Sequence, residues 1–337
     1  MPASAGEGPH IHFETRPTKP RVFRITQALI DEAKARNKIS LPTSLGEEWR
    51  DLSLLSAAVG IVTGIDLIAD PKFPRHHLQD VAPNLRWIQV TGAGIELALP
   101  LDWLPPQVVL LNNSGVHVEK IRESAAMMLL MLNARVPEIV TNQRQARWLQ
   151  IFTPQIRGRT VLIIGVGDMG GGVAQAGRQL GLRVLGVRRS GTPHPDVEWM
   201  FKPDEIDAAL PQADFVVLAT PLTQETATLL DRRRFALMKP GAAFVNIGRS
   251  GSADYVALAD ALKSGAISGA VIDVYDQEPL PVNSPLWGIG NLIMMPHVTS
   301  DDEDHYLRKT FDMVFENVRR IAAGKPLLNV VDRNRGY

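Results

Sequence analysis

Short apolar runs recur from residue 160 onward, and longer segments of mixed polarity separate them. Runs of four or five apolar residues without alternation are typical of strands that are covered on both faces. The segments between them, such as 255–263 with Gly265 after it, have the periodicity and the stop signal of helices. The pattern predicts a doubly wound α/β sheet. Its six predicted strands are Val161–Ile164, Val184–Val187, Phe215–Ala219, Ala243–Ile247, Ala270–Val274 and Leu292–Met295.

The first 115 residues show a weaker form of the same alternation. Four further strands are predicted there, at Val22–Ile25, Val59–Val62, Trp87–Val90 and Val108–Leu111. Thr26 stands where it can cap a helix that runs to Arg36. We therefore expect a second α/β unit in this part of the chain.

Two long helices are predicted around the second unit. Residues 119–135 are rich in Ala, Met and Leu and predict a helix that connects the units. Apolar residues then repeat every three or four positions from Leu307 to Ile321, before Gly324 and Pro326, which predicts an amphipathic C-terminal helix. These elements divide the chain into residues 118–298 and a domain of residues 1–117 that 299–337 complete.

Composition and charge exclude several classes of protein. The 337 residues include 36 basic and 36 acidic side chains, so the formal charge of zero excludes a nucleic-acid binder driven by bulk charge. Cysteine is absent, which excludes disulfides and thiolate sites. The longest apolar stretch, Ala125–Leu132, is shorter than the roughly 18 residues of a membrane span. The first ten residues lack the apolar core of a signal peptide, so we expect a cytoplasmic protein with no membrane partner.

A glycine-rich loop follows the strand 161–164. Its sequence is Gly165-Val166-Gly167-Asp168-Met169-Gly170, and a helix-compatible run and a second strand come after it. The first glycine permits a tight turn, the second lets the backbone approach a pyrophosphate, and the third allows close helix packing. Gly171 and Gly172 continue the run at about 1 kcal/mol each within a helix, which predicts a loose first turn. The loop predicts a dinucleotide site.

The end of the second strand bears on the choice of dinucleotide. Arg188, Arg189 and Ser190 stand where an acidic residue would bind the ribose of NAD. Two guanidinium groups and a hydroxyl suit a 2′-phosphate instead. We therefore predict a preference for NADP(H). Solvated surface arginines in an enzyme that accepts either cofactor are the alternative, which leaves NAD(H) open.

Three polar segments follow later strands, at the sheet edge where ligands bind in such folds. They are Asn246–Gly251, Asp273–Pro281 and Pro296–Ser300. Their order, N-x-x-R-x-G, D-V-x-x-x-E-P-L-P and P-H-V, resembles the D-2-hydroxyacid dehydrogenase family over roughly residues 85–300. Arg188–Ser190 and the tail 331–337 are similar to its NADP-dependent glyoxylate/hydroxypyruvate reductase branch. The resemblance implies a Rossmann cofactor domain, a flavodoxin-like substrate domain and a cleft between them.

The chemistry of keto-acid reduction explains the three residues that the resemblance implies as catalytic. Hydride arriving at the substrate carbon leaves negative charge on the carbonyl oxygen, and His297 is the candidate acid that protonates it. Glu278 would hydrogen-bond the ring and favour its protonated form. Arg249 would bind the carbonyl oxygen and the carboxylate, so Arg249 and His297 are also expected to bind substrate.

Further positions complete the expected site. The turn at Gly92, Ala93 and Gly94 follows a predicted strand, and its backbone amides suit a substrate carboxylate. The resemblance implies that Thr220, Pro221 and Ile247 line the cofactor and that Asp273 lies on its nicotinamide side. His117 is expected to be a hydrogen-bonded loop residue, and the remaining histidines lack the spacing of a metal site. The resemblance also implies a homodimer through residues 119–135 and the segment that follows.

The predicted activity is NADPH-dependent reduction of a small 2-keto acid, such as glyoxylate or hydroxypyruvate, to the D-2-hydroxy acid. One alternative is formate or phosphite oxidation on the same scaffold, although formate enzymes have Gln at the position of Glu278. Another is a cofactor-sensing interaction protein without turnover, against which the intact set of Arg249, Glu278 and His297 argues.

Overall fold

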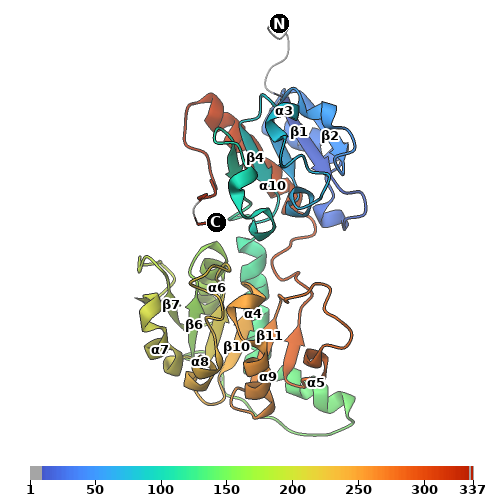
Figure 1. The fold of residues 1–337 in the computed structure, drawn as a ribbon. Helices are drawn as coiled ribbons and strands as arrows, with labels where there is room; N and C mark the ends of the chain where they lie inside the picture. Colours follow the sequence, from blue (N-terminus) through green and yellow to red (C-terminus); the bar gives the residue numbers. More distant parts are fainter. Residues whose placement is uncertain (1–9, 334, 337) are drawn as a thin grey trace, which may run out of the picture. The chain divides into compact units, whose positions relative to one another are not determined.

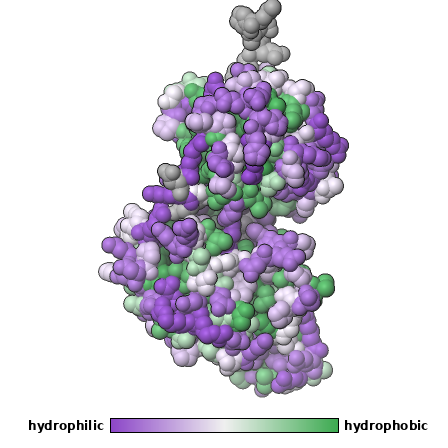
Figure 2. Space-filling model, viewed as in Figure 1, coloured by the Kyte–Doolittle hydropathy of each residue, from purple (hydrophilic) through white to green (hydrophobic). Residues whose placement is uncertain are grey.

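The computed structural model describes residues 10–333, 335 and 336. The chain forms two compact units, one of Met1–Val116 with Asp302–Tyr337 and one of His117–Asp301. Each unit is built on one parallel sheet (Figure 1). Polar residues dominate the visible surface of both units, with hydrophobic residues scattered among them (Figure 2).

The sheet of the first unit has the strand order β2-β1-β3-β4-β5, and every pairing is parallel. This is the flavodoxin-like order that the family resemblance implies. Its strands are β1 (His10–Thr15), β2 (Thr43–Glu47), β3 (Ala58–Thr63), β4 (Trp87–Val90) and β5 (Val109–Leu111).

The strand predicted at Val22–Ile25 is wrong. Residues Arg21–Phe23 form a short 3-10 helix, η1, and their apolar side chains pack on the core without joining the sheet. The true first strand, β1, escapes the pattern because His12 and Glu14 interrupt its apolar residues. Both are buried, and His12 Nε2 lies 2.8 Å from Glu14 Oε2. Each side chain therefore has a hydrogen-bond partner inside the core, which offsets the cost of burying it.

Two helices pack on one face of this sheet, α1 (Gln27–Asn37) and α10 (Tyr306–Ala322). The predicted cap of α1 is confirmed, because the Thr26 hydroxyl accepts from the Leu29 N–H. Phe13 of β1 meets Phe311 of α10 edge to face, with ring centroids 5.3 Å apart. The helix predicted from the spacing of Leu307 to Ile321 is therefore confirmed, and its apolar side is the one that covers the sheet.

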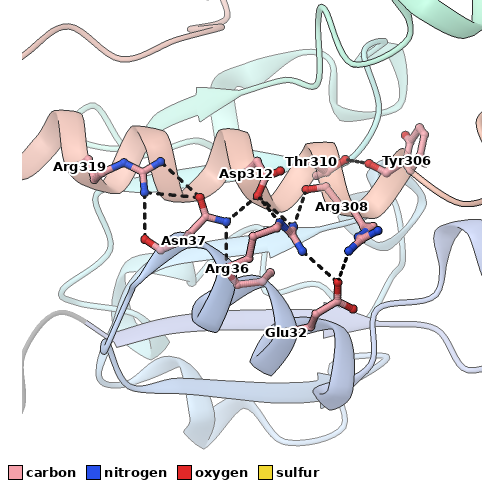
Figure 3. Close-up of polar contacts among 9 residues, drawn as sticks. Glu32, Arg36, Asn37, Tyr306, Arg308, Thr310, Asp312 and Arg319 are labelled. Atoms are coloured by element: carbon pink, nitrogen blue, oxygen red, sulfur yellow. Dashed lines mark hydrogen bonds and ion pairs between the residues drawn. The ribbon is translucent and has the colours of Figure 1, made fainter.

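Polar contacts join the outer sides of α1 and α10 (Figure 3). The Arg36 guanidinium donates to Asp312 at 2.9 Å and to the Arg308 carbonyl at 3.2 Å. Arg308 in turn donates to Glu32 at 2.6 Å. These contacts fasten the C-terminal helix to the N-terminal part of the chain. The short elements of this unit are η2 (Leu52–Leu55), α2 (Ile65–Ile68), α3 (Leu78–Val81), η3 (Glu96–Ala98) and η4 (Leu101–Trp103).

The sheet of the second unit has the order β12-β11-β10-β9-β6-β7-β8, again all parallel. This is the Rossmann order with one extra strand. All six predicted strands are confirmed, and β8 was missed because it is a three-residue edge strand with an exposed Trp199. The strands are β6 (Thr160–Ile164), β7 (Arg183–Val187), β8 (Trp199–Phe201), β9 (Phe215–Leu218), β10 (Ala243–Asn246), β11 (Gly269–Ile272) and β12 (Leu292–Met294).

Alternate residues of the interior strand β6 lie in two hydrophobic cores. Leu162 and Ile164 pack with side chains of α8 and α9, whereas Val161 and Ile163 pack with side chains of α4 and α6. The sheet is thus covered on both faces, as the uninterrupted apolar runs predict. The helices are α4 (Val118–Asn133), α5 (Val136–Arg144), α6 (Asp168–Gln179), α7 (Ile206–Ala209), α8 (Arg232–Leu237) and α9 (Tyr255–Lys263), with 3-10 turns η5 (Pro203–Glu205), η6 (Leu210–Gln212), η7 (Ser250–Ser252) and η8 (Pro285–Gly288). Across the ranges that the structure describes, no helix combines the length and the apolar character of a membrane span.

The glycine run at the start of α6 has a packing role. A Cβ on Gly172 would lie 2.7 Å from Ile121 Cγ2 and 3.0 Å from the Val118 carbonyl oxygen, both on α4. Only glycine allows this approach of the two helices. Gly171 and Gly172 are buried within a continuous helix, so the loose first turn that the sequence predicts is not observed.

Candidate active site

The glycine loop connects β6 to α6, and Gly167 is the one of its three glycines at which a side chain would meet no neighbouring atom. Gly165 has φ +99°, and a Cβ there would lie 2.8 Å from the Ala219 carbonyl group. A Cβ on Gly170 would lie 2.1 Å from the Gly165 oxygen, whereas a Cβ on Gly167 would meet nothing within 4 Å. Gly167 caps α6 without any side-chain hydrogen bond. Asp168 and Met169 form the first turn of that helix. The residues fit a dinucleotide, because the backbone can approach a pyrophosphate at Gly167 and the amides of α6 can receive its charge.

A buried hydroxyl beside this loop supports the same fit. Thr220 follows β9, and a Cβ on Gly165 would lie 2.9 Å from its Cγ2. The Thr220 Oγ1 atom is buried and finds no hydrogen-bond partner within the described ranges. Gly248 packs on the Thr220 backbone, where a Cβ would lie 2.6 Å from its carbonyl oxygen. A bound cofactor would supply the missing partner. Pro221 is exposed next to it, and Ile247 is buried directly after β10.

The three residues predicted to bind a 2′-phosphate follow β7. Arg188 is partly buried, and Arg189 and Ser190 are exposed. The Arg188 N–H donates to Phe201 of β8 at 3.0 Å, and the Gly191 N–H donates to the Arg188 carbonyl at 2.9 Å. In the part of the chain that the structure describes, the Arg188 guanidinium forms no ion pair with an acidic side chain. An anionic ligand would therefore not have to displace a protein carboxylate from it.

His297 and Glu278 form a hydrogen-bonded pair. The Nδ1 atom of His297 lies 2.8 Å from Glu278 Oε2, and Glu278 Oε1 accepts from the Tyr275 N–H at 3.0 Å. A carboxylate only accepts, so Nδ1 carries the proton of this bond and Nε2 is the atom that can gain or release one. The His297 side chain is 46% exposed, which leaves the ring accessible to a substrate.

The turn after His297 is bound to Asp273, which follows β11. Asp273 Oδ1 accepts from the Val298 N–H at 2.9 Å, and Oδ2 accepts from the Thr299 N–H at 3.3 Å and from its hydroxyl at 2.5 Å. Asp273 is 3% exposed, and burial raises the pKa of its carboxyl above the ordinary value. The role of Thr299 has no signal in the sequence, because its contact depends on two loops that the sheet brings together.

Arg249 lies in the turn between β10 and η7. Its Nη1 donates to the Gly248 carbonyl at 2.8 Å. Asn246, wholly buried, shapes the turn: its Oδ1 accepts from the Gly248 N–H at 3.0 Å, and its Nδ2 donates to the Arg249 carbonyl at 3.1 Å. Asn246 is the first residue of the N-x-x-R motif, and that spacing is the only sign in the sequence of its role in the turn.

His117 caps α4 close to these groups. Its Nδ1 donates to the Ser300 carbonyl at 3.2 Å, as expected of a hydrogen-bonded histidine, and lies 3.6 Å from Asp301 Oδ1. Burial lowers the pKa of His117, and the nearby charges of Arg249 and His297 act in the same direction. Burial also raises the pKa of Asp301 to about 6. The electrostatic neighbourhood of His117 thus includes two of the three candidate catalytic residues, Arg249 and His297.

The turn Gly92–Gly94 belongs to the first unit and follows β4. The Gly92 carbonyl accepts from the Asn113 N–H at 2.9 Å, and the Ala93 carbonyl accepts from the Asn112 side chain at 3.0 Å. Among the described residues, the N–H groups of Gly92, Ala93 and Gly94 have no protein acceptor. A backbone turn of this kind suits a carboxylate ligand.

Comparison with known proteins places this arrangement in a family. The model of the D-isomer specific 2-hydroxyacid dehydrogenase NAD-binding domain matches residues 126–299. Glyoxylate/hydroxypyruvate reductase B of Citrobacter koseri is 34% identical over 230 residues, which are 66% of this chain and 71% of that protein.

Solved structures agree over nearly the whole chain. A D-isomer specific 2-hydroxyacid dehydrogenase of Xanthobacter autotrophicus Py2, in complex with NADPH and MES, has a TM-score of 0.81 and 28% identity and covers 98% of this chain and 100% of its own. A probable 2-hydroxyacid dehydrogenase of Rhizobium etli, in complex with NADP, HEPES and L(+)-tartaric acid, has a TM-score of 0.80 and 25% identity with the same coverage. The chain therefore belongs to the D-isomer specific 2-hydroxyacid dehydrogenase family of oxidoreductases.

Proposed function

We propose that the protein reduces a small 2-keto acid of the glyoxylate and hydroxypyruvate class to the D-2-hydroxy acid, with NADPH as the reductant. The observation that carries this proposal is the His297–Glu278 pair. It stands after β11 and β12, at the carboxyl edge of the sheet that also bears the glycine loop. The acid for a developing alkoxide and the seat for a dinucleotide thus belong to one edge of one sheet.

The cofactor would be held by three groups of residues. Gly165, Gly167, Asp168, Met169 and Gly170 would receive the pyrophosphate, Thr220, Pro221, Ile247 and Asp273 would line the dinucleotide, and Arg188, Arg189 and Ser190 would bind the 2′-phosphate. When bound, NADPH supplies the hydride. The similar structures from X. autotrophicus and R. etli contain NADPH and NADP, which supports this choice, with NAD(H) as the weaker cofactor.

His297 would donate the proton from Nε2 to the carbonyl oxygen of the substrate. Glu278 holds the opposite nitrogen, so it orients the ring and stabilises the protonated imidazole that must exist before transfer. Such a positioned acid contributes a factor of about 100 to 10,000 in rate.

Two groups would bind the substrate. The Arg249 guanidinium would bind the carbonyl oxygen and the carboxylate, and charge that grows on the oxygen during hydride transfer strengthens that contact. The backbone amides of Gly92, Ala93 and Gly94 would receive the carboxylate from the first unit, which is then the substrate domain. The second unit is the cofactor domain.

A panel assay tests the function. Purified protein should oxidise NADPH with glyoxylate, hydroxypyruvate or a bulkier 2-keto acid, and chiral analysis should find the D-isomer wherever the product is chiral. Absence of turnover with every keto acid would contradict the proposal. Reduction of NADP⁺ by formate or phosphite would replace it with the alternative reaction.

We also propose that two copies of this chain form a homodimer, with α4, α5 and the segment after them at the interface. Apolar side chains are exposed along this stretch, among them Leu130, Ile139, Trp148, Leu149 and Phe152, of which Trp148 is 95% and Phe152 87% exposed. Exposed apolar side chains gathered in one stretch, with large aromatic ones among them, are typical of an interface. Sedimentation velocity should find a dimer, and the double variant Trp148→Ser with Phe152→Ser should sediment as a monomer.

A further inference from the structure

One buried carboxylate fastens the two residues that follow His297. Asp273 accepts the N–H of Val298, the N–H of Thr299 and the hydroxyl of Thr299. Both carboxylate oxygens are used, and Asp273 and Thr299 are only 3% and 2% exposed. Thr299 is almost wholly buried, so it can affect a substrate only through the groups that it contacts.

That residue has an unusual backbone conformation. His297 has φ 55°, in the left-handed region, which a residue with a Cβ occupies only when its surroundings require it. The chain before it is also held, because the Tyr275 hydroxyl donates to the Met295 carbonyl at 2.8 Å and the Met295 N–H donates to Ile272 at 2.8 Å. His297 is thus presented between two anchored segments.

The Thr299 hydroxyl makes the shortest of the three contacts to Asp273. Burial disfavours the charged carboxyl, while hydrogen bonds from Thr299 and Val298 favour it. A protonated carboxyl would have to use one oxygen as a donor, and it would then lose an acceptor for the turn. The hydroxyl therefore both binds the turn and helps to keep Asp273 an acceptor.

We infer that Thr299 is a positioning residue for His297: through Asp273 it holds the turn in the conformation that pairs the imidazole with Glu278. Thr299 itself contacts neither substrate nor cofactor in this mechanism. The inference rests on the proposed function for its kinetic consequence, but the position of the imidazole is measurable without turnover.

The test compares Thr299→Val, which removes the hydroxyl and keeps the shape, with Thr299→Ser, which keeps the hydroxyl. Thr299→Val should lower kcat about 10- to 100-fold, as expected for a misplaced catalytic group, and leave the KM for NADPH unchanged. It should also move the pH profile of kcat, since the pairing with Glu278 is weakened. Thr299→Ser should restore both. Thr160→Val, a buried threonine at the amino end of β6, is the matched control and should behave as wild type.

A second measurement separates this inference from the proposed function. In the ligand-free protein labelled with ¹⁵N-histidine, Thr299→Val should shift the Nδ1 resonance of His297 away from its hydrogen-bonded position, and Thr299→Ser should not. An unchanged resonance and an unchanged kcat in Thr299→Val would overturn the inference, as would an equal loss in Thr299→Ser, which would assign the effect to the methyl group. Wild-type protein that turns over no keto acid would overturn the proposed function alone, because the resonances still test the turn.

Discussion

The Nδ1 atom of His297 lies 2.8 Å from the Oε2 atom of Glu278, although the two residues are 19 positions apart. Glu278 stands in the loop after β11 and His297 in the loop after β12. Adjacent parallel strands carry both residues to the same sheet edge. The pair distinguishes the two nitrogens of the imidazole. Nδ1 faces the Glu278 carboxylate, and Nε2 is the nitrogen that the proposed mechanism uses for proton transfer to the substrate.

His297→Gln removes the titratable group and keeps a side chain of similar reach. We expect kcat for keto-acid reduction to fall about 100- to 10,000-fold, because proton transfer loses its donor. Binding of NADPH, followed by its fluorescence, should be retained. Activity near wild type would assign the acid to another group.

Glu278→Gln removes the carboxylate that accepts from Nδ1 of His297 and keeps a side-chain oxygen in its place. A neutral acceptor holds the ring more weakly than a carboxylate, so we expect kcat for keto-acid reduction to fall about tenfold. Steady-state assays with saturating NADPH measure this, and NADPH binding should be retained. A kcat equal to that of wild type would contradict the role given to Glu278.

Arg188→Asp combined with Arg189→Ser should reverse the cofactor preference. The change removes two cations from the 2′-phosphate and supplies a carboxylate for a ribose hydroxyl. Since each charge-assisted hydrogen bond contributes about 1.5–3 kcal/mol, kcat/KM with NADPH should fall at least tenfold while that with NADH rises. An unchanged ratio of the two values would show that the arginines are only surface charges.

Gly167→Ala and Gly172→Ala are a matched pair within eight residues of β6. A Cβ on Gly167 meets no protein atom within 4 Å, so that variant should fold normally and raise the KM for NADPH about tenfold, or about 1.4 kcal/mol. A Cβ on Gly172 would lie 2.7 Å from Ile121 Cγ2, so that variant should lose about 1–3 kcal/mol of stability instead. Urea unfolding and cofactor titration of both variants check this, and equal effects on both quantities would contradict it.

Asp301→Asn should stabilise the protein in a pH-dependent way. Burial raises the pKa of Asp301 to about 6, so its contribution to stability is complete below the ordinary pKa near 3.8 and is lost as the pH rises through 6. The variant should therefore gain about 1–3 kcal/mol over wild type at about pH 7.5 and lose that advantage toward about pH 4. Urea unfolding at both pH values measures this, with the exposed Asp304→Asn as control; a gain independent of pH would contradict it.

The strands of the second unit could be predicted because most of their residues are apolar and follow one another directly, as in 161–164. In the first unit, buried polar residues interrupt the apolar pattern, so the strand β1 was not predicted. His12 and Glu14 lie in an interior strand, where their side chains form a hydrogen bond with each other that no local pattern reveals. Val22 and Phe23 look like a strand, yet they fill the core from a 3-10 turn.

The same limit applies to the site. Motif order along the chain pointed to Arg249, Glu278 and His297, because each follows a strand. The contacts of Thr299 with Asp273 and of Asn246 with the Arg249 turn were not predicted. Thr299 and Asp273 lie 26 positions apart, so only the strand order brings them together. Asn246 contacts Arg249 within one turn, and the residue types alone do not give the backbone conformation of that turn.

The first unit consists of two stretches of chain, and its helix α10 comes from the second. During synthesis on the ribosome, β1 to β5 emerge long before the residues that cover Phe13 and its neighbours. The part of the sheet's apolar face that α10 covers stays exposed while the whole second unit is translated and can fold, because of the two helices on this face only α1 has been made. The part of the protein that is begun first is thus finished last, and its unburied apolar surface is open to aggregation while the nascent chain grows.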